Sequence, residues 1–210
     1  MPNTLGCIDC THIPLRAPSE NEHTFVNRKG RHTMNIQAIV DSKMRFLNVV
    51  AKWPGSTHDA FIWESCNVLE DFRMGRMPAG WLLGDSGYPL QPWLLTPVAN
   101  PNTQSERRFN SSLSRTRVCV EQAFGLLKSR FRCLDLSGGS LCYDPLRVCK
   151  ITISCCVLHN ICIARNIQPP DNIVNMVLDQ DDAPFPDFGD NRHAERGQQI
   201  RRHLIDTWFT

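Results

Sequence analysis

The sequence predicts an α/β fold, in which a mixed β-sheet is covered on its faces by helices. Three observations support this prediction. The elements follow the order strand, strand, strand, helix, strand, helix; the early segments are short and apolar; and the later segments are long and amphipathic. Antiparallel strands that lead into strands alternating with helices form a mixed sheet between helices. The 210 residues, with 41% hydrophobic and 21% charged content, fit one globular domain of ordinary size.

The N-terminal half supplies the predicted strands. Short apolar runs bounded by Gly, Pro, Asp or Ser are typical of strands. Such runs, or extended segments, occupy Leu5–Cys10, Thr33–Val40, Arg45–Lys52, Trp81–Leu83 and Trp93–Val98. Asp41-Ser42-Lys43 joins the second and third runs as a hairpin, and the polar, basic stretch Arg16–Arg31 is expected to be a loop. A helix is expected to begin at His58-Asp59 and to end near Leu69.

The C-terminal half supplies the longer helices. In Ser105–Arg132, apolar residues recur on one face at helical spacing. Cys133–Leu136 is expected to be an edge strand and Pro145–Arg165 a buried helix. The predicted organisation is a main domain over residues 1–166, an acidic Pro-containing linker over 167–192 and a C-terminal amphipathic helix over 193–210.

The net charge of +2 conceals an uneven distribution. Ser105–Arg132 contains seven Arg or Lys residues against two Glu, whereas Gln168–Asn191 carries six Asp and no basic residue. Basic surfaces neutralise the phosphates of polyanions and release counterions, so a polyanion is an expected partner. The acidic stretch is either a shield for the basic face or a passive linker.

The ten cysteines are expected to be reduced. The first residues, Met1-Pro2-Asn3-Thr4, have neither the basic start nor the apolar core of a signal peptide. Several cysteines lie inside apolar runs, where a thiol packs as a small hydrophobe. These features favour the cytosol or the nucleus. The longest apolar stretch, Ile151–Ile163, is too short to span a membrane, so no membrane partner is expected.

Three carboxylates are candidate metal ligands. Asp9 lies in an apolar strand, Asp85 follows the strand at Trp81–Leu83, and Glu121 lies in the middle of the long helix. Strands of one sheet can bring the two Asp residues together, and the following helix can place Glu121 over them. Magnesium is held by carboxylates, and two such ions about 4 Å apart promote phosphodiester hydrolysis. The alternatives are an exposed strand end for Asp9 and an ordinary turn for Asp85.

One helical stripe places Glu121 in a row of basic residues. It consists of Arg117, Glu121, Gly125, Lys128 and Arg132. Its three cations are expected to contact the phosphate backbone of DNA, with solvated surface charges as the alternative. Gly125 indicates a close approach of backbone or ligand, because Gly within a helix is unfavourable by about 1 kcal/mol. The alternative for Glu121 is an exposed i,i+4 ion pair with Arg117.

Asp59 is a fourth candidate ligand. It stands at the expected helix start, directly after Gly55-Ser56-Thr57 and His58. The more common role of Asp at such a position is to cap the helix. A fourth carboxylate would also suit a site that holds two metal ions.

Six ordered segments carry a family resemblance. They are Gly6–Ile13, Arg28-Lys29-Gly30 with Asn35-Ile36-Gln37, Pro54–Ala60, Leu83–Tyr88, Val120–Lys128 and Leu158–Ile161. By these motifs the chain resembles the Harbinger transposase-derived nucleases, which have a DDE-type catalytic domain. The resemblance covers nearly the whole chain.

The resemblance implies a ribonuclease-H-like fold and a DDE-type nuclease domain over residues 1–166. It implies that Asp9, Asp85 and Glu121 form the catalytic triad and that Asp59 is a further metal ligand. It also implies Mg²⁺ or Mn²⁺ as cofactor, DNA as substrate, and the nucleus as location, with the cytoplasm as the alternative. A separate Myb-like DNA-binding protein is the implied partner. The expected activity is hydrolysis of phosphodiester bonds in DNA by a two-metal mechanism.

Two features depart from the family pattern. Cys10 follows Asp9 where the family has Gly, so its side chain either crowds the metal site or points into the core. Family members also carry a helical N-terminal region with DNA-binding character, whereas Met1 is only eight residues before Asp9 here. The expectation is therefore either a nuclease domain alone or a truncated gene product.

Two other functions are open at this point. A structural zinc site could use Cys7 and Cys10, but neighbouring strand positions face opposite ways and no second CxxC completes the ligand set. Cys155, His159 and Cys162 share a helical face, where buried packing is the favoured interpretation. The other function is that of an inactive domesticated transposase that binds DNA or a protein. All four carboxylates are retained, which favours activity.

Overall fold

Five strands and five α-helices make up the described part of the chain, which comprises residues 1–169 and 191–210 of the computed structural model. The strands are β1 (Thr4–Pro14), β2 (Thr33–Val40), β3 (Phe46–Pro54), β4 (Trp81–Leu83) and β5 (Leu94–Leu95). The helices are α1 (Asp59–Glu64), α2 (Asn67–Arg73), α3 (Gln104–Arg130), α4 (Pro145–Ala164) and α5 (Asn191–Trp208). Short 3-10 turns form η1 (Glu22–Phe25), η2 (Arg132–Leu134) and η3 (Leu136–Gly138).

The strands form one mixed sheet in the order β3-β2-β1-β4-β5. β1 pairs antiparallel with β2 and parallel with β4, so it lies at the centre and is hydrogen-bonded on both sides. β2 also pairs antiparallel with β3, and β4 pairs parallel with β5. The prediction of an α/β fold with a mixed sheet is confirmed.

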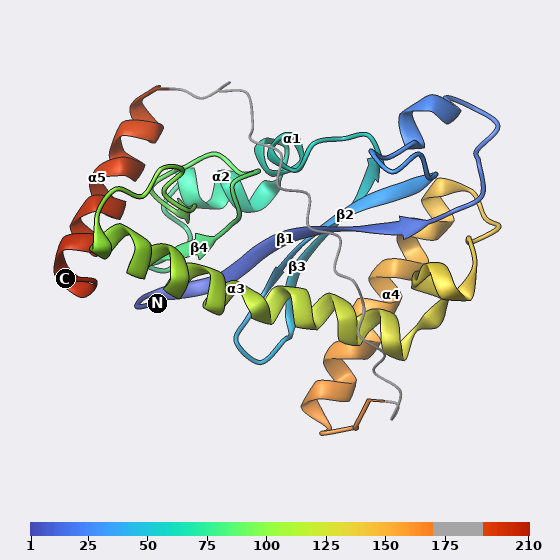
Figure 1. Ribbon diagram of the computed structural model, residues 1–210. Helices are drawn as coiled ribbons and strands as arrows, with labels where there is room; N and C mark the ends of the chain where they lie inside the picture. Colours follow the sequence, from blue (N-terminus) through green and yellow to red (C-terminus); the bar gives the residue numbers. More distant parts are fainter. Residues whose placement is uncertain (170–190) are drawn as a thin grey trace.

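Side-chain alternation along the strands divides the core between the two faces of the sheet. On one face, Cys7 and Leu83 pack with buried residues of α3, α4 and α5. On the other face, Ile8 and Leu82 pack against α1 and α2, where Trp63 is fully buried. Figure 1 shows α3 following β1 along its length, with α1 and α2 on the far side of the sheet.

Strongly periodic segments lie where the sequence predicts them. β2 and β4 match their predicted ranges, and β1 extends four residues beyond its predicted end, to Pro14. α3 begins at Gln104 because Thr103 and Glu106 form a capping box that satisfies the first backbone N–H groups of the helix. Such a cap defines the helix start more sharply than periodicity does.

The predicted edge strand at Cys133–Leu136 is wrong. This segment forms the 3-10 turns η2 and η3. The Phe131 N–H bonds the Leu127 carbonyl and ends α3, and the Asp135 carboxylate accepts the Ser137 N–H and caps the second turn. Local hydrogen bonds therefore satisfy this backbone without a neighbouring strand.

The helix predicted from His58 to Leu69 is two helices. Cys66 has extended backbone torsions, φ −93° and ψ 133°, and separates α1 from α2. The break lets both helices turn apolar residues toward the sheet, including Ile62, Leu69 and Phe72.

α4 is buried on one face only, which corrects the prediction of a buried helix. Thr152 and His159 are buried, whereas Ile153, Val157 and Ile161 are 41–55% exposed. The Asn160 side chain attaches the helix to β3 by two hydrogen bonds with the backbone of residue 46. Among the described helices, α4 has the length and apolar composition of a membrane span, a test that core helices of globular proteins also pass.

The remaining predictions concern the C-terminal region. The amphipathic helix predicted over 193–210 is α5, which buries Leu204 and Ile205. The acidic linker over 167–192 lies largely outside the described residues, so it stays a prediction, as does the division into domains.

Candidate active site

The sheet brings Asp9 and Asp85 together. β1 and β4 pair in parallel with Cys7 opposite Leu83, and each Asp lies two residues further along its strand direction. Asp85 follows the end of β4 and accepts the Gly87 N–H through Oδ1 (2.9 Å), while Asp9 Oδ1 accepts the Cys10 N–H (2.8 Å). Both side chains are largely buried, at 18% exposure for Asp9 and 13% for Asp85. Neither is an exposed strand end or an ordinary surface turn.

Arg117 lies between these two aspartates. Its guanidinium Nη2 is 3.1 Å from Asp9 Oδ2 and 3.8 Å from Asp85 Oδ2, and the Arg117 side chain is 12% exposed. The alternative for Glu121, an exposed ion pair with Arg117, is therefore not favoured, because Arg117 is largely buried and pairs with the two aspartates. The reason is the packing of α3 on β1, which turns this part of the helix toward the sheet.

Glu121 and Asp59 lie on the wall of the same cavity as the two aspartates. The cavity has a volume of about 600 Å³ and is lined by all four carboxylates and by Arg117. Asp59 is the first residue of α1 rather than its cap, because His58 occupies the cap position and no side chain caps this helix. Asn35 donates through Nδ2 to Asp59 Oδ1 (2.9 Å) and to the Thr57 carbonyl (2.8 Å), and so positions the carboxylate.

Burial and mutual repulsion raise the pKa of Asp9. The pKa rises from 3.8 to about 7, mainly because burial disfavours the charged form; Arg117 opposes this rise, and Asp85 adds to it. Burial also disfavours the charged form of Arg117, but Asp9, Asp85 and Glu121 outweigh it and raise the pKa of the guanidinium. Four carboxylates with one guanidinium give this part of the cavity an excess of negative charge, which favours a bound cation.

Cys10 lies on the cavity wall, where the family resemblance leads one to expect Gly. Its sulfur is 3.3 Å from the Tyr88 hydroxyl, and burial raises the pKa of both groups well above their ordinary values. Cys10 is therefore a neutral neighbour of the carboxylates. Cys7 faces α3 instead, with its sulfur 3.4 Å from the Thr116 carbonyl, so the two cysteines do not converge on a zinc ion.

The donor chemistry of the site fits a hard divalent cation, because carboxylate oxygens are the ligands that Mg²⁺ and Mn²⁺ prefer. In the part of the chain that is described, no three Asp, Glu, His or Cys side chains are close enough together to hold one ion. Arg117 supplies the positive charge between Asp9 and Asp85 in this arrangement. A cation that binds both aspartates has to compete with this guanidinium.

Only part of the predicted basic stripe of α3 lines the cavity. Gly125 and Lys128 line the cavity together with Arg117 and Glu121. A Cβ at Gly125 would meet no atom within 4 Å, so the expected close approach of protein backbone is wrong and the glycine faces open space. Arg132 lies beyond the end of α3, in η2, and donates to Ser137 outside the cavity lining.

Sequence reasoning did not assign roles to the polar residues of β2 or to Tyr88. Asn35 and Gln37 are 2% and 0% exposed, and the Tyr88 hydroxyl donates to Gln37 Oε1 (3.5 Å). The available signal is the alternation of Thr33, Asn35 and Gln37 within an otherwise apolar strand. Buried polar side chains need hydrogen-bond partners, and here Asn35 bonds Asp59 and Gln37 bonds Tyr88, so this strand face supports the site from behind the cavity wall.

Comparisons with known proteins agree with this geometry. The profile of the DDE superfamily endonucleases matches residues 8–160, which include all four carboxylates. The mouse protein “Putative nuclease HARBI1” is 36% identical and its human counterpart 35% identical, each over the whole of this chain and 60% of the relative. “Protein ALP1-like” of Arabidopsis thaliana is 32% identical over 82% of this chain and 46% of its own length.

The chain thus spans about 60% of the length of the mouse and human relatives. No solved structure matches it. The mixed sheet with helices on both faces is of the ribonuclease-H-like type that the resemblance implies. On this fold and this sequence similarity, the chain belongs to the DDE superfamily endonucleases, among the Harbinger transposase-derived nucleases.

Proposed function

We propose that this chain is a DNA endonuclease of transposase origin that hydrolyses phosphodiester bonds by a two-metal mechanism with Mg²⁺ or Mn²⁺. The observation that carries the proposal is the convergence of Asp9, Asp59, Asp85 and Glu121 on one cavity, although they come from separate parts of the sequence. Asp9, Asp85 and Glu121 are the proposed catalytic triad, and Asp59 is a further metal ligand.

Bound cations would supply two things, an activated water and stabilisation of the leaving oxygen. The residues of the chain supply the rest. Arg117 holds the carboxylates of Asp9 and Asp85 in place and puts a positive charge where the charge of a phosphate develops. Asn35 orients Asp59, and burial of Asp9 favours the arrival of positive charge beside it.

We infer that Arg117, Lys128 and Arg132 contact the DNA backbone, the first two inside the cavity and Arg132 on the exposed surface beyond it. The nucleus is the proposed location, with the cytoplasm as the alternative, because ten free thiols suit a reducing compartment. A Myb-like DNA-binding protein is the proposed partner.

The test is cleavage of supercoiled plasmid in Mg²⁺ or Mn²⁺ by the wild type and by Asp85→Asn. The substitution should lower the cleavage rate by more than about a hundredfold, since even the outer partners of a metal site are worth 10- to 100-fold. Asp71→Asn is a matched control, because Asp71 is a surface carboxylate that pairs with Arg76. Equal cleavage by wild type and Asp85→Asn, or cleavage in EDTA, would contradict the proposal.

An inactive DNA-binding module is the second candidate function. The observation that favours it is the guanidinium of Arg117, which already occupies the space between the two central aspartates and supplies a positive charge there. A protein of this kind would bind DNA with a steep salt dependence and leave plasmid intact in both metals.

A further inference from the structure

We propose that the turn from Asn27 to Arg31, together with Lys128, forms a phosphate-binding subsite at the far end of the cavity. The ligand is the sugar-phosphate backbone of the DNA strand, at a phosphate close to the bond that is cut. The location of this subsite relative to the cut rests on the proposed function. The binding itself does not require cleavage.

The turn is held in one conformation by a buried side chain. Asn27 is 9% exposed, and its Oδ1 accepts the N–H groups of Lys29 (3.0 Å) and Arg31 (3.1 Å). The Asn27 N–H also donates to the Arg31 carbonyl, and the Gly30 N–H donates to the Asn27 carbonyl. Gly30 has φ +71°, a left-handed conformation that L side chains rarely adopt. The backbone therefore fixes where the Lys29 and Arg31 side chains begin.

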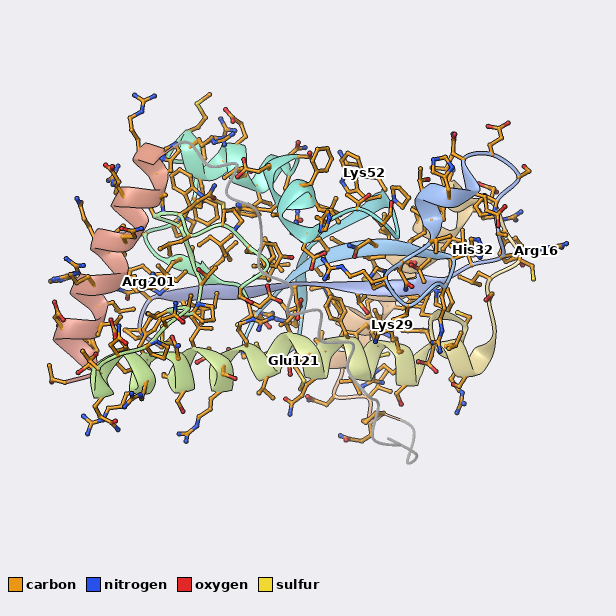
Figure 2. All side chains as sticks on the ribbon, turned by 45° about the horizontal axis from the view of Figure 1, so that its top comes forward. Arg16, Lys29, His32, Lys52, Glu121 and Arg201 are labelled. Atoms are coloured by element: carbon orange, nitrogen blue, oxygen red, sulfur yellow. The ribbon has the colours of Figure 1, made fainter. Side chains whose placement is uncertain are left out.

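The cavity has two ends of opposite charge. At one end lie the four carboxylates with Arg117; the other end is lined by Lys29, Arg31 and Lys128 against the single carboxylate of Asp135. α3 and β1 run side by side in the same direction, because Arg117 bonds Asp9 near one end and Lys128 bonds the His12 carbonyl further along. Figure 2 shows Lys29 over the later half of α3, beyond Glu121.

The separation of the two ends suits consecutive phosphates of one strand. Glu121 and Lys128 are seven residues apart on α3, which corresponds to about 10 Å at 1.5 Å per residue. Phosphates along one strand of B-DNA advance by about 3.4 Å per nucleotide along the duplex axis, and their direct separation is longer because the strand also winds around that axis. A strand with its reacting phosphate at the carboxylates therefore places a nearby phosphate of the same strand beside Lys128.

The basic residues of the turn differ in whether they line the cavity. Arg28 bonds His58 at the start of α1 (3.2 Å) and is not among the residues that line the cavity. Lys29 and Arg31 do line it, and both are exposed to solvent along their side chains. Lysine and arginine at such a position neutralise phosphates and release counterions.

The experiment measures DNA binding without cutting. Affinities for a fluorescent duplex are determined in EDTA over about 50–200 mM salt for the wild type and for Lys29→Gln/Arg31→Gln. Loss of two phosphate contacts should reduce the slope of log K against log salt by about 1.8 and weaken binding at least tenfold near 0.1 M salt. Lys43→Gln is the matched control, because Lys43 lies in the exposed β2–β3 turn at the other end of β2.

Asn27→Ala provides a second variant that keeps every charge. It removes the acceptor of two backbone hydrogen bonds, so binding should weaken while the salt slope stays within about half a unit of wild type. Wild-type affinity and slope in the double variant, or an equal loss in Lys43→Gln, would overturn the subsite.

The subsite and the nuclease activity can fail separately. If the double variant loses affinity but wild type never cleaves plasmid, the subsite is supported and the proposed function is not. If wild type cleaves in Mn²⁺ and the double variant binds and cleaves equally well, the subsite alone is refuted.

Discussion

Replacement of Asp9 by Asn should stabilise the metal-free protein at neutral and alkaline pH. Asn has nearly the shape of a protonated Asp but never ionises. The largest cause of the raised pKa of Asp9 is burial, which penalises its charged form. The uncharged amide of the Asp9→Asn variant would avoid that penalty, so a residue proposed to be catalytic is expected to reduce stability in the absence of metal.

The magnitude follows from the shift of this pKa from 3.8 to about 7. Between these pH values the native protein keeps the proton that the unfolded chain has already lost, so wild-type stability falls as pH rises and then levels off above pH 7. Each pKa unit corresponds to about 1.36 kcal/mol, so the loss is on the order of 4 kcal/mol. Wild type and Asp9→Asn should be equally stable near pH 4 and differ by up to this amount at pH 8.

The assay is urea unfolding in EDTA at pH 4.0, 6.0 and 8.0, followed by far-UV circular dichroism. Addition of Mg²⁺ at pH 8.0 should raise the stability of wild type more than that of Asp9→Asn, because the variant lacks one of the proposed ligands. A variant that is less stable than wild type at pH 8.0 in EDTA would refute the reasoning. An equal gain on adding Mg²⁺ would refute the assignment of Asp9 as a ligand.

Two further substitutions test the contacts of α3. Arg117→Gln leaves two largely buried carboxylates without their cation, so it should destabilise the metal-free protein by about 3 kcal/mol. Mg²⁺ should then restore more stability to the variant than to wild type. Urea unfolding with and without Mg²⁺ measures both effects, and an unchanged midpoint in EDTA would contradict the ion pair. Thr103→Ala removes the capping box that joins Thr103 to Glu106, so it should lower the free energy of unfolding by about 1 kcal/mol without affecting plasmid cleavage. Thr103→Ser keeps the hydroxyl and should be neutral. Thermal unfolding would show the loss of stability, and a loss of cleavage by the fully folded variant would contradict a purely structural role.

The elements and the active site differ in how far the sequence alone can predict them. Periodicity and turn residues are local signals, so they predict β2 and β4 to the residue and α3 to within two residues. The prediction fails at Cys133–Leu136 because apolar residues in a short segment fit a strand or a turn equally well, and its hydrogen bonds with neighbouring residues decide between them.

The residues of the site could be predicted from the sequence, whereas their contacts with distant residues could not. The four carboxylates could be predicted because motifs of the family surround them, and all four line the cavity. The main partner of Arg117 could not be predicted, because Arg117 and Asp9 are 108 positions apart and meet only through the packing of α3 on β1. Asp59 is open to two interpretations in the sequence, and the structure decides against the cap because His58 occupies that position.

The dispersal of the carboxylates over β1, α1, the end of β4 and α3 has a consequence for the newly made protein. During synthesis, Asp9 emerges early and Glu121 more than a hundred residues later, with the sheet incomplete in between. No fragment that stops before α3 contains the assembled cavity. The proposed activity therefore requires a chain that extends at least through Glu121 in α3.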